Sequence, residues 1–212
     1  MTQISSSHYN FKEYNSIGRW ASYYYQVWYC LHSGCSDVLI IGKGDGLLET
    51  ILKKYDANMR IVTFDYADDL NPDICGNVLE LSSHCSLESY SLVVCCQVLE
   101  HLPFDKFDKA LLEISKVLKP KGRLILSLPD SGICPDLYIH IPKLGDFRIA
   151  PKICKFYRKE FEFEGQHYWE INSARKYPLK LIRKKIHNKY MIQKEFLVPL
   201  NAFHRFFICE KM

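Results

Sequence analysis

The sequence lacks the segments that would direct a chain to a membrane or through one. Residues 1–10 have neither the basic start nor the apolar stretch of a secretory signal. No apolar run is long enough to span a bilayer. The 212 residues, of which 48% are hydrophobic and 25% charged, suffice for one globular domain with a sizeable core. We therefore expect a single cytoplasmic domain.

Spacings typical of metal sites are also absent. The nine cysteines include no Cys-x-x-Cys and no paired Cys/His spacing, and their number is odd. These features favour reduced, mostly buried thiols over a disulfide framework. We predict no metal site. A zinc site assembled from residues far apart in the sequence is the less favoured alternative.

Basic side chains outnumber acidic ones only in the C-terminal part of the chain. Residues 1–150 carry 14 basic and 18 acidic side chains, whereas residues 151–212 carry 14 and 6. The net charge of +4 is too small to indicate nucleic acid as a partner. The basic cluster between Arg175 and Lys185 leaves weak contact with phosphate or an anionic membrane surface open, although a solvated helix face is the more common explanation.

Buried strands alternate with amphipathic helices through most of the chain, which predicts a Rossmann-like α/β fold. We expect a doubly wound, mostly parallel sheet of about seven strands with a C-terminal antiparallel hairpin. Helical spacing is predicted for residues 17–31, 47–55, 104–118 and 179–186. Strands are predicted at residues 38–41, 60–64, near 74, 92–96, 123–128, 192–198 and 203–209.

Within the single predicted domain, residues 1–212, four parts can be distinguished. They are a leading helix (1–36), a cofactor-binding core (37–129), a substrate-side insertion (130–175), and a basic helix with the closing hairpin (176–212). We expect the insertion to contain short helices and loops that cover a pocket. Residues 167–171 look strand-like, which would place Trp169 on the same face as His167.

The leading helix carries aromatic residues at helical spacing. Trp20, Tyr24 and Trp28 are predicted to form one stripe that faces the body of the protein. The same residues could lean over a cationic cofactor by cation–π attraction. A simple core stripe is the more common explanation.

A glycine-rich turn, Gly42 to Gly46, separates the first predicted strand from the helix that follows. Such turns let backbone N–H groups approach a ligand above the strand ends. Asp65 ends the next strand, where a carboxylate can bind both ribose hydroxyls. Leu47 stands where a dinucleotide fingerprint needs its third glycine, and there is no Gly-Lys-Ser/Thr phosphate loop. The turn therefore predicts an adenosine-containing cofactor and disfavours a nicotinamide dinucleotide.

Four blocks of the sequence, at residues 38–46, 72–78, 91–102 and 118–124, resemble motifs of one family in the family's order. The chain is thereby similar to class I S-adenosylmethionine-dependent methyltransferases of the small-molecule, type 11-like kind. The resemblance implies S-adenosylmethionine as cofactor. The cofactor-binding residues that it implies are Gly42, Gly44 and Gly46 beside the methionine moiety, Asp65 on the ribose, Tyr66, Asn77 and Val78 at the adenine, and Gln97 near the methyl group.

Two positions depart from the family pattern. Ile40 stands where the family usually has an acidic residue that helps to hold the cofactor's ammonium group, and an isoleucine cannot accept that hydrogen bond. Asn77 replaces a frequent aspartate, but its carbonyl can still accept from the adenine amino group. Ile40, together with Lys43, keeps open a second hypothesis, in which the domain is non-catalytic and only binds a cofactor or regulates.

Two histidines are candidates for the base that methylation of a hydroxyl requires. His101 follows the fourth predicted strand, near the place where the methyl group should project, although it could instead cap or pack under the next helix. His167, with Glu170, comes from the substrate-side region, where an ordinary strand is the alternative. No Asn-Pro-Pro-Tyr and no Pro-Cys nucleophile is present, so we expect a small-molecule, sugar-linked or lipid-linked acceptor. The sequence indicates neither its identity nor an oligomeric state.

Overall fold

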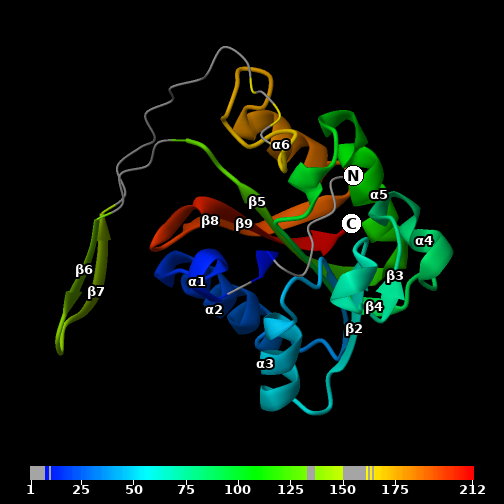
Figure 1. Ribbon diagram of the computed structural model, residues 1–212, viewed down its shortest axis with the longest axis horizontal. Coiled ribbons are helices and arrows are strands. Elements are labelled where there is room, and N and C mark those ends of the chain that lie inside the picture. Colours follow the sequence, from blue (N-terminus) through cyan, green and yellow to red (C-terminus); the bar gives the residue numbers. More distant parts are fainter. Residues whose placement is uncertain (1–7, 10, 133–136, 150–160, 162, 164) are drawn as a thin grey trace.

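One seven-stranded sheet, in the order β3-β2-β1-β4-β5-β9-β8, forms the centre of the protein in the computed structural model (Figure 1). The structure describes residues 8–9, 11–132, 137–149, 161, 163 and 165–212. The strands are β1 (Asp37–Ile41), β2 (Arg60–Asp65), β3 (Ile74–Cys75), β4 (Tyr90–Cys96), β5 (Leu118–Pro129), β8 (Tyr190–Val198) and β9 (Asn201–Lys211). β1 to β5 are parallel, whereas β9 is antiparallel to both β5 and β8. The predicted fold class is thereby confirmed.

Helices cover both faces of this sheet, because strand residues that are buried on both sides alternate between two cores. Figure 1 shows α2 and α3 below the sheet and α5 and α6 above it. Leu39 and Val93 belong to the core on the side of α5, and their neighbours Val38 and Leu92 belong to the core on the side of α2. The helices are α1 (Phe11–Tyr14), α2 (Ile17–Leu31), α3 (Leu47–Tyr55), α4 (Leu81–His84), α5 (Phe107–Val117) and α6 (Leu179–His187).

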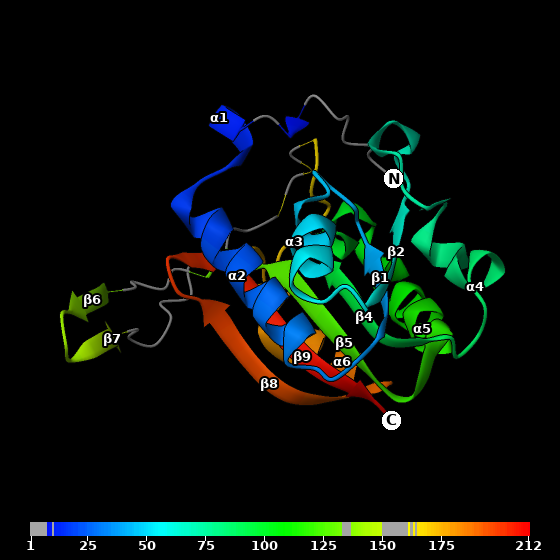
Figure 2. The same ribbon diagram turned by 90° about the horizontal axis from the view of Figure 1, so that it is seen from below.

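The leading helix α2 has the predicted bounds but not the predicted orientation. Trp20, Tyr24 and Trp28 are 42%, 57% and 44% exposed. The buried side of α2 instead carries Tyr23 and Cys30. Figure 2 shows α2 beside α3. The predicted inward aromatic stripe is therefore wrong. Periodicity identified the helix, but several apolar faces competed for burial, and packing against the sheet decided between them.

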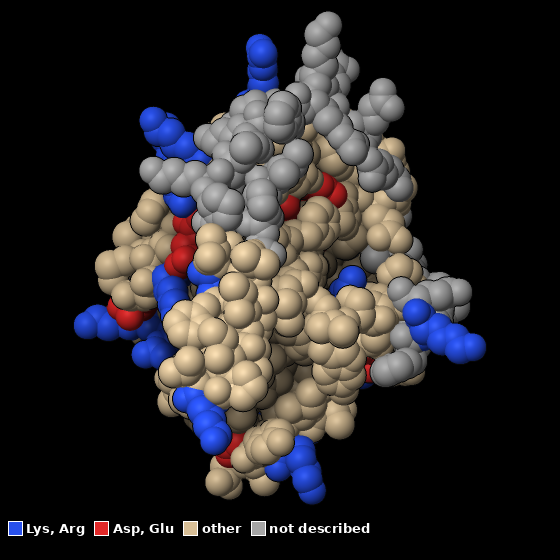
Figure 3. All heavy atoms as spheres, turned by 90° about the vertical axis from the view of Figure 1, so that its left-hand side faces the viewer, with Lys and Arg blue, Asp and Glu red and all other residues tan. Residues whose placement is uncertain are grey.

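Within the insertion, residues 137–149 form a β-hairpin, β6 (Leu137–Ile141) and β7 (Gly145–Ile149), so the short helices predicted there are wrong for these residues. Much of its apolar surface, including Leu144 and Phe147, is exposed. Figure 3 looks at the side from which the hairpin projects, where uncharged side chains fill the centre and Lys and Arg lie mainly around the edge. Residues 133–136, 150–160, 162 and 164 of the predicted insertion lie outside the described part of the chain.

Residues 167–171 do not form a strand, although Ile171 makes an isolated bridge to Asp130. His167 Nδ1 lies 2.8 Å from Glu170 Oε1. Trp169 is fully buried, and its indole N–H donates to the Leu102 carbonyl at 3.0 Å. The predicted strand alternation, with His167 and Trp169 on one face, is therefore wrong, because tertiary contacts bend this segment.

The C-terminal part follows the sequence pattern closely. Ile182 and Ile186 of α6 are buried, whereas Arg183 reaches Glu195 of β8 at 2.6 Å, so part of the basic cluster is used in ion pairs within the chain. The seven described cysteines are free thiols, and four of them are buried. Among the described residues, no helix is long and apolar enough to cross a membrane.

Candidate cofactor and active site

The strand register brings the predicted cofactor residues to one edge of the sheet. Ile41 at the end of β1 pairs with Phe64 of β2 on one side and with Cys95 of β4 on the other. Gly42 and Asp65, which follow, therefore lie side by side at the carboxyl ends of the strands, the usual place for a ligand in such a sheet. The Gly42 N–H also donates to the Phe64 carbonyl at 2.8 Å.

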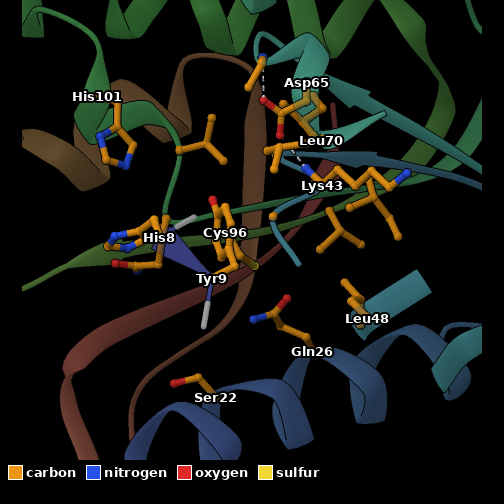
Figure 4. Close-up of a pocket in the computed structure, with 18 of the residues that line it drawn as sticks. His8, Tyr9, Ser22, Gln26, Lys43, Leu48, Asp65, Leu70, Cys96 and His101 are labelled. Atoms are coloured by element: carbon orange, nitrogen blue, oxygen red, sulfur yellow. Dashed lines mark hydrogen bonds between the residues drawn. The ribbon is translucent and has the colours of Figure 1, made fainter. Parts of the chain in front are cut away.

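A cavity of about 410 Å³ opens at this edge, a size typical of small-molecule sites. Figure 4 shows Asp65 and Lys43 on one side of it and His101 on the other. The predicted site residues that line it are Gly42, Gly44, Asp65, Tyr66, Val78, Gln97, His101 and His167. The described hairpin residues 137–149 are not among its lining residues. The predicted role of the insertion as a cover over the pocket is therefore not seen for them.

The turn after β1 needs glycine for two physical reasons. Gly42, Gly44 and Gly46 have φ values of 84°, 57° and 71°, which side chains disfavour. A Cβ on Gly42 would also lie 2.4 Å from Cγ2 of Val98. Gly46 is not among the lining residues and instead stands at the N-cap of α3. Its placement is that of a turn residue rather than a ligand contact.

The Asp65 carboxylate is fixed by backbone donors. The Lys43 N–H donates to its Oδ2 at 2.7 Å, and the Ala67 N–H donates to its Oδ1 at 3.0 Å. The Lys43 ammonium group does not pair with Asp65 but donates to the Asn71 carbonyl. Each carboxylate oxygen keeps a second lone pair, so the group can still accept from a ligand's hydroxyls.

Of the two remaining predicted cofactor residues, Gln97 lines the cavity and Asn77 does not. Gln97 lines the cavity with φ 56°, and its side-chain amide donates to Ser127 Oγ at 2.9 Å. Asn77 is not a lining residue, because its side chain accepts from the Leu79 N–H at 3.0 Å and caps a 3₁₀ turn. Ile40, the departure from the family pattern, does line the cavity and gives it an apolar surface.

Several lining residues come from the N-terminal segment and were missed from the sequence. They include Tyr9, Tyr14, Arg19, Tyr23 and Gln26. Burial raises the pKa of the Tyr9 phenol, and the acidic groups nearby, Asp65 among them, raise it further, so the phenol stays neutral. Tyr23 donates to Asp45 at 2.9 Å. Tyr9 and Tyr14 precede α2, where the sequence has no periodic pattern, whereas Arg19, Tyr23 and Gln26 lie on α2, whose inward face was predicted to carry other residues.

The two predicted catalytic histidines meet at the cavity although 66 positions separate them. The ring centroids of His101 and His167 lie 5.1 Å apart. His101 Nδ1 lies 2.9 Å from the Gln166 carbonyl oxygen, which favours the tautomer with a proton on Nδ1. Burial lowers the pKa of His101, so its ring is neutral near pH 7.

Two further titratable groups beside these rings are buried. The carboxylate of Glu100 is fully buried, and neither of its oxygens has a hydrogen-bond partner. Burial raises the pKa of Glu100 to about 8, although the His167 ring and the residue's own backbone N–H oppose this rise. His204 lines the cavity with an unpaired Nδ1. Burial, with Arg19 and His167 nearby, lowers the pKa of His204 to about 3.

A doubly wound sheet with a glycine turn and a carboxylate at adjacent strand ends defines a nucleoside-binding α/β protein. Within it, residues 39–126 match the model of the family described as "Methyltransferase domain". The family whose model this part of the chain matches is the one that the sequence motifs predicted. A relative from Methanocaldococcus jannaschii, described as uncharacterised, is 36% identical over 94 residues. The match covers 43% of this chain and only 36% of that protein.

Solved structures share the fold over nearly the whole chain. A protein from Pyrococcus horikoshii has a TM-score of 0.63 at 14% identity and covers 99% of this chain and 100% of its own. The 1,6-didemethyltoxoflavin-N1-methyltransferase of Burkholderia thailandensis has a TM-score of 0.56 at 16% identity, covering 92% and 77%. The latter was solved with 1,6-didemethyltoxoflavin and S-adenosylhomocysteine bound. At these identities the likeness concerns the fold.

Proposed function

We propose that the protein transfers the methyl group of S-adenosylmethionine to a small-molecule, sugar-linked or lipid-linked acceptor. The observation that carries this proposal is the cavity at the strand ends of a methyltransferase domain, where the glycine turn and the fixed Asp65 carboxylate lie together. In that arrangement Asp65 receives the ribose hydroxyls, and the turn leaves room for the methionine moiety. The cytoplasmic location expected from the sequence is part of this proposal.

The opposite side of the cavity suits the acceptor. His101, His167 and Phe203 line it, and the rings of His167 and Phe203 are stacked with centroids 6.4 Å apart. Methyl transfer is an in-line displacement, so holding the nucleophile, the methyl carbon and the sulfur in line supplies much of the rate enhancement, with effective molarities on the order of 10⁵ M or more. A neutral His101 can accept the proton of a hydroxyl acceptor.

A non-catalytic cofactor-binding domain is the second candidate. It is favoured by Ile40, which lines the cavity in place of the family's usual carboxylate. Two polar residues of α2, Gln26 and Tyr23, line the same cavity, and the Tyr23 hydroxyl donates a hydrogen bond to Asp45. Detection of methyl transfer to any acceptor would exclude this second candidate.

Calorimetric titration with S-adenosylmethionine and S-adenosylhomocysteine tests the proposal. Asp65→Asn should weaken binding at least tenfold, because each lost hydrogen bond to a charged group is worth about 1.5–3 kcal/mol and a tenfold change is about 1.4 kcal/mol. Asp68→Asn is the matched control, since Asp68 is exposed and outside the cavity. Circular dichroism would check that each variant is folded. No binding by the wild type at millimolar ligand would overturn the proposal.

A further inference from the structure

Three side chains beside the cavity form a cluster that neither a cofactor site nor a single base requires. Each of Glu100, His101 and His167 offers an oxygen or nitrogen atom, and these atoms all lie within 4.8 Å of one another. Glu100 and His101 belong to the 3₁₀ turn after β4, whereas His167 lies in the substrate-side insertion. The tertiary structure alone brings them together.

The buried carboxyl group of Glu100 indicates that this cluster binds a ligand. Its side chain is fully buried, and both of its oxygens lack a hydrogen-bond partner. A carboxyl group in such a place stays protonated unless a cation compensates the charge of its ionised form. A bound cation would supply the partner.

Nδ1 of each histidine faces a hydrogen-bonding oxygen atom, as is common for histidines that bind metals through Nε2. His101 Nδ1 lies 2.9 Å from the Gln166 carbonyl oxygen, and His167 Nδ1 lies 2.8 Å from Glu170 Oε1. Glu170 in turn accepts from the Ser131 hydroxyl. Such outer partners fix the ring orientation and the tautomer, which directs Nε2 to the metal. Among the residues that the structure describes, the exposed pair of His140 and Asp146 belongs to no such cluster of three metal-binding side chains.

We propose that Glu100, His101 and His167 bind one divalent transition-metal cation at the acceptor side of the cavity. Two imidazoles and one carboxylate suit Mn²⁺, Fe²⁺, Co²⁺ or Zn²⁺, whereas Mg²⁺ and Ca²⁺ prefer oxygen ligands. Three protein ligands leave positions open for the acceptor or water. This differs from our sequence-based prediction of no metal site, in which a zinc site assembled from residues far apart in the sequence was the less favoured alternative.

This inference rests on the proposed methyl transfer. With the metal bound, water instead of His101 can accept the proton of a hydroxyl acceptor. A hydroxyl acceptor bound to the cation loses its proton to water more readily, because the positive charge lowers its pKa. Its oxygen then forms the bond to the methyl carbon while the bond from that carbon to sulfur breaks, and S-adenosylhomocysteine leaves. His101 and His167 act as ligands in this arrangement, and His101 is no longer required as the base.

Metal binding can be measured on the whole chain without an acceptor. Metal-free protein would be titrated with Mn²⁺, Co²⁺, Zn²⁺ and Mg²⁺ in a calorimeter, and the visible absorption of bound Co²⁺ would be recorded. We expect one site for the transition metals and much weaker binding of Mg²⁺. Glu100→Gln and His101→Asn should remove this site, whereas Glu170→Gln should weaken it about 10- to 100-fold because it only orients His167. His140→Asn is the matched control.

The outcomes separate this inference from the proposed function. S-adenosylhomocysteine should bind the metal-free protein and Glu100→Gln as it binds the wild type, because Asp65 and the glycine turn are unchanged. Glu100→Gln should leave the metal-free protein at least as stable, since it removes a buried carboxylate with no partner. The inference is overturned if no transition metal binds at about 1 mM, or if Glu100→Gln and His101→Asn bind as tightly as the wild type. Loss of S-adenosylhomocysteine binding would instead contradict the proposed function.

Discussion

Replacing Gly42 by alanine should destabilise the protein for two reasons that can be measured separately. Its φ of 84° is unfavourable for a residue with a Cβ, which costs about 1–2 kcal/mol. The new methyl group would also lie 2.4 Å from Cγ2 of Val98, and such overpacking costs about 1–3 kcal/mol more. We therefore expect Gly42→Ala to lower the free energy of unfolding by about 2–5 kcal/mol.

Gly34 provides the matched control, because its φ is 68° and a Cβ there would meet no atom within 4 Å. Gly34→Ala should cost only the backbone part, about 1–2 kcal/mol. Val98→Ala removes the obstructing methyl groups, so Gly42→Ala/Val98→Ala should be more stable than the sum of the two single changes predicts. A favourable coupling energy of about 1–3 kcal/mol is expected.

Urea unfolding of the wild type, the three single variants and the double variant would measure these free energies, and titration with S-adenosylhomocysteine would follow the site. The double variant should recover stability, yet its cofactor affinity should stay reduced because the strained backbone remains. The reasoning would be refuted if Gly42→Ala cost no more than Gly34→Ala. It would equally be refuted if Val98→Ala added its full cost in the double variant.

Two further predictions concern buried ionisable groups. His204 has a pKa of about 3 in the folded state, against about 6.5 when unfolded. Its contribution to stability is therefore complete above pH 6.5 and declines, by at most about 1.4 kcal/mol per pH unit, as the pH falls towards 3. Urea unfolding between about pH 7 and pH 4 should show a shallower decline for His204→Gln, and an unchanged slope would contradict this. Arg205 Nε lies 2.6 Å from Asp130 Oδ2, and both side chains are buried. Arg205→Met should cost about 3–5 kcal/mol, and adding Asp130→Asn should restore part of it, because the buried charge is then gone. Equal stability of the single and double variants would refute the explanation.

The sequence predicted the sheet well because its signals are local. Each parallel strand is a short apolar run, and the helices between strands repeat at the helical period, so the elements of the core could be placed one by one. The glycine turn and Asp65 identified the cofactor end of the sheet, since residues that follow adjacent parallel strands must lie together. The same local signals misled at α2, where Tyr24 and Trp28 fit an inward stripe but are exposed.

Contacts between segments far apart in the chain could not be predicted from the sequence. Tyr9 lines the cavity beside Gly44, and the polar residues around it in the sequence give no periodic signal. Residues 167–171 looked like a strand with His167 and Trp169 on one face. The hydrogen bonds of Trp169 to Leu102 and of His167 to Glu170 instead bend that segment.

The sequence by itself determined the doubly wound fold, the family and the edge of the sheet at which a cofactor would bind, because these depend on residue order within each βα unit. Only the tertiary structure decided which side chains share the acceptor side of the cavity. Glu100 and His101 stand 66 or 67 positions before His167, and no spacing rule covers such a separation. Their meeting depends on how residues 165–171 pack against the turn after β4, where the Tyr168 N–H donates to the Glu100 carbonyl at 2.9 Å.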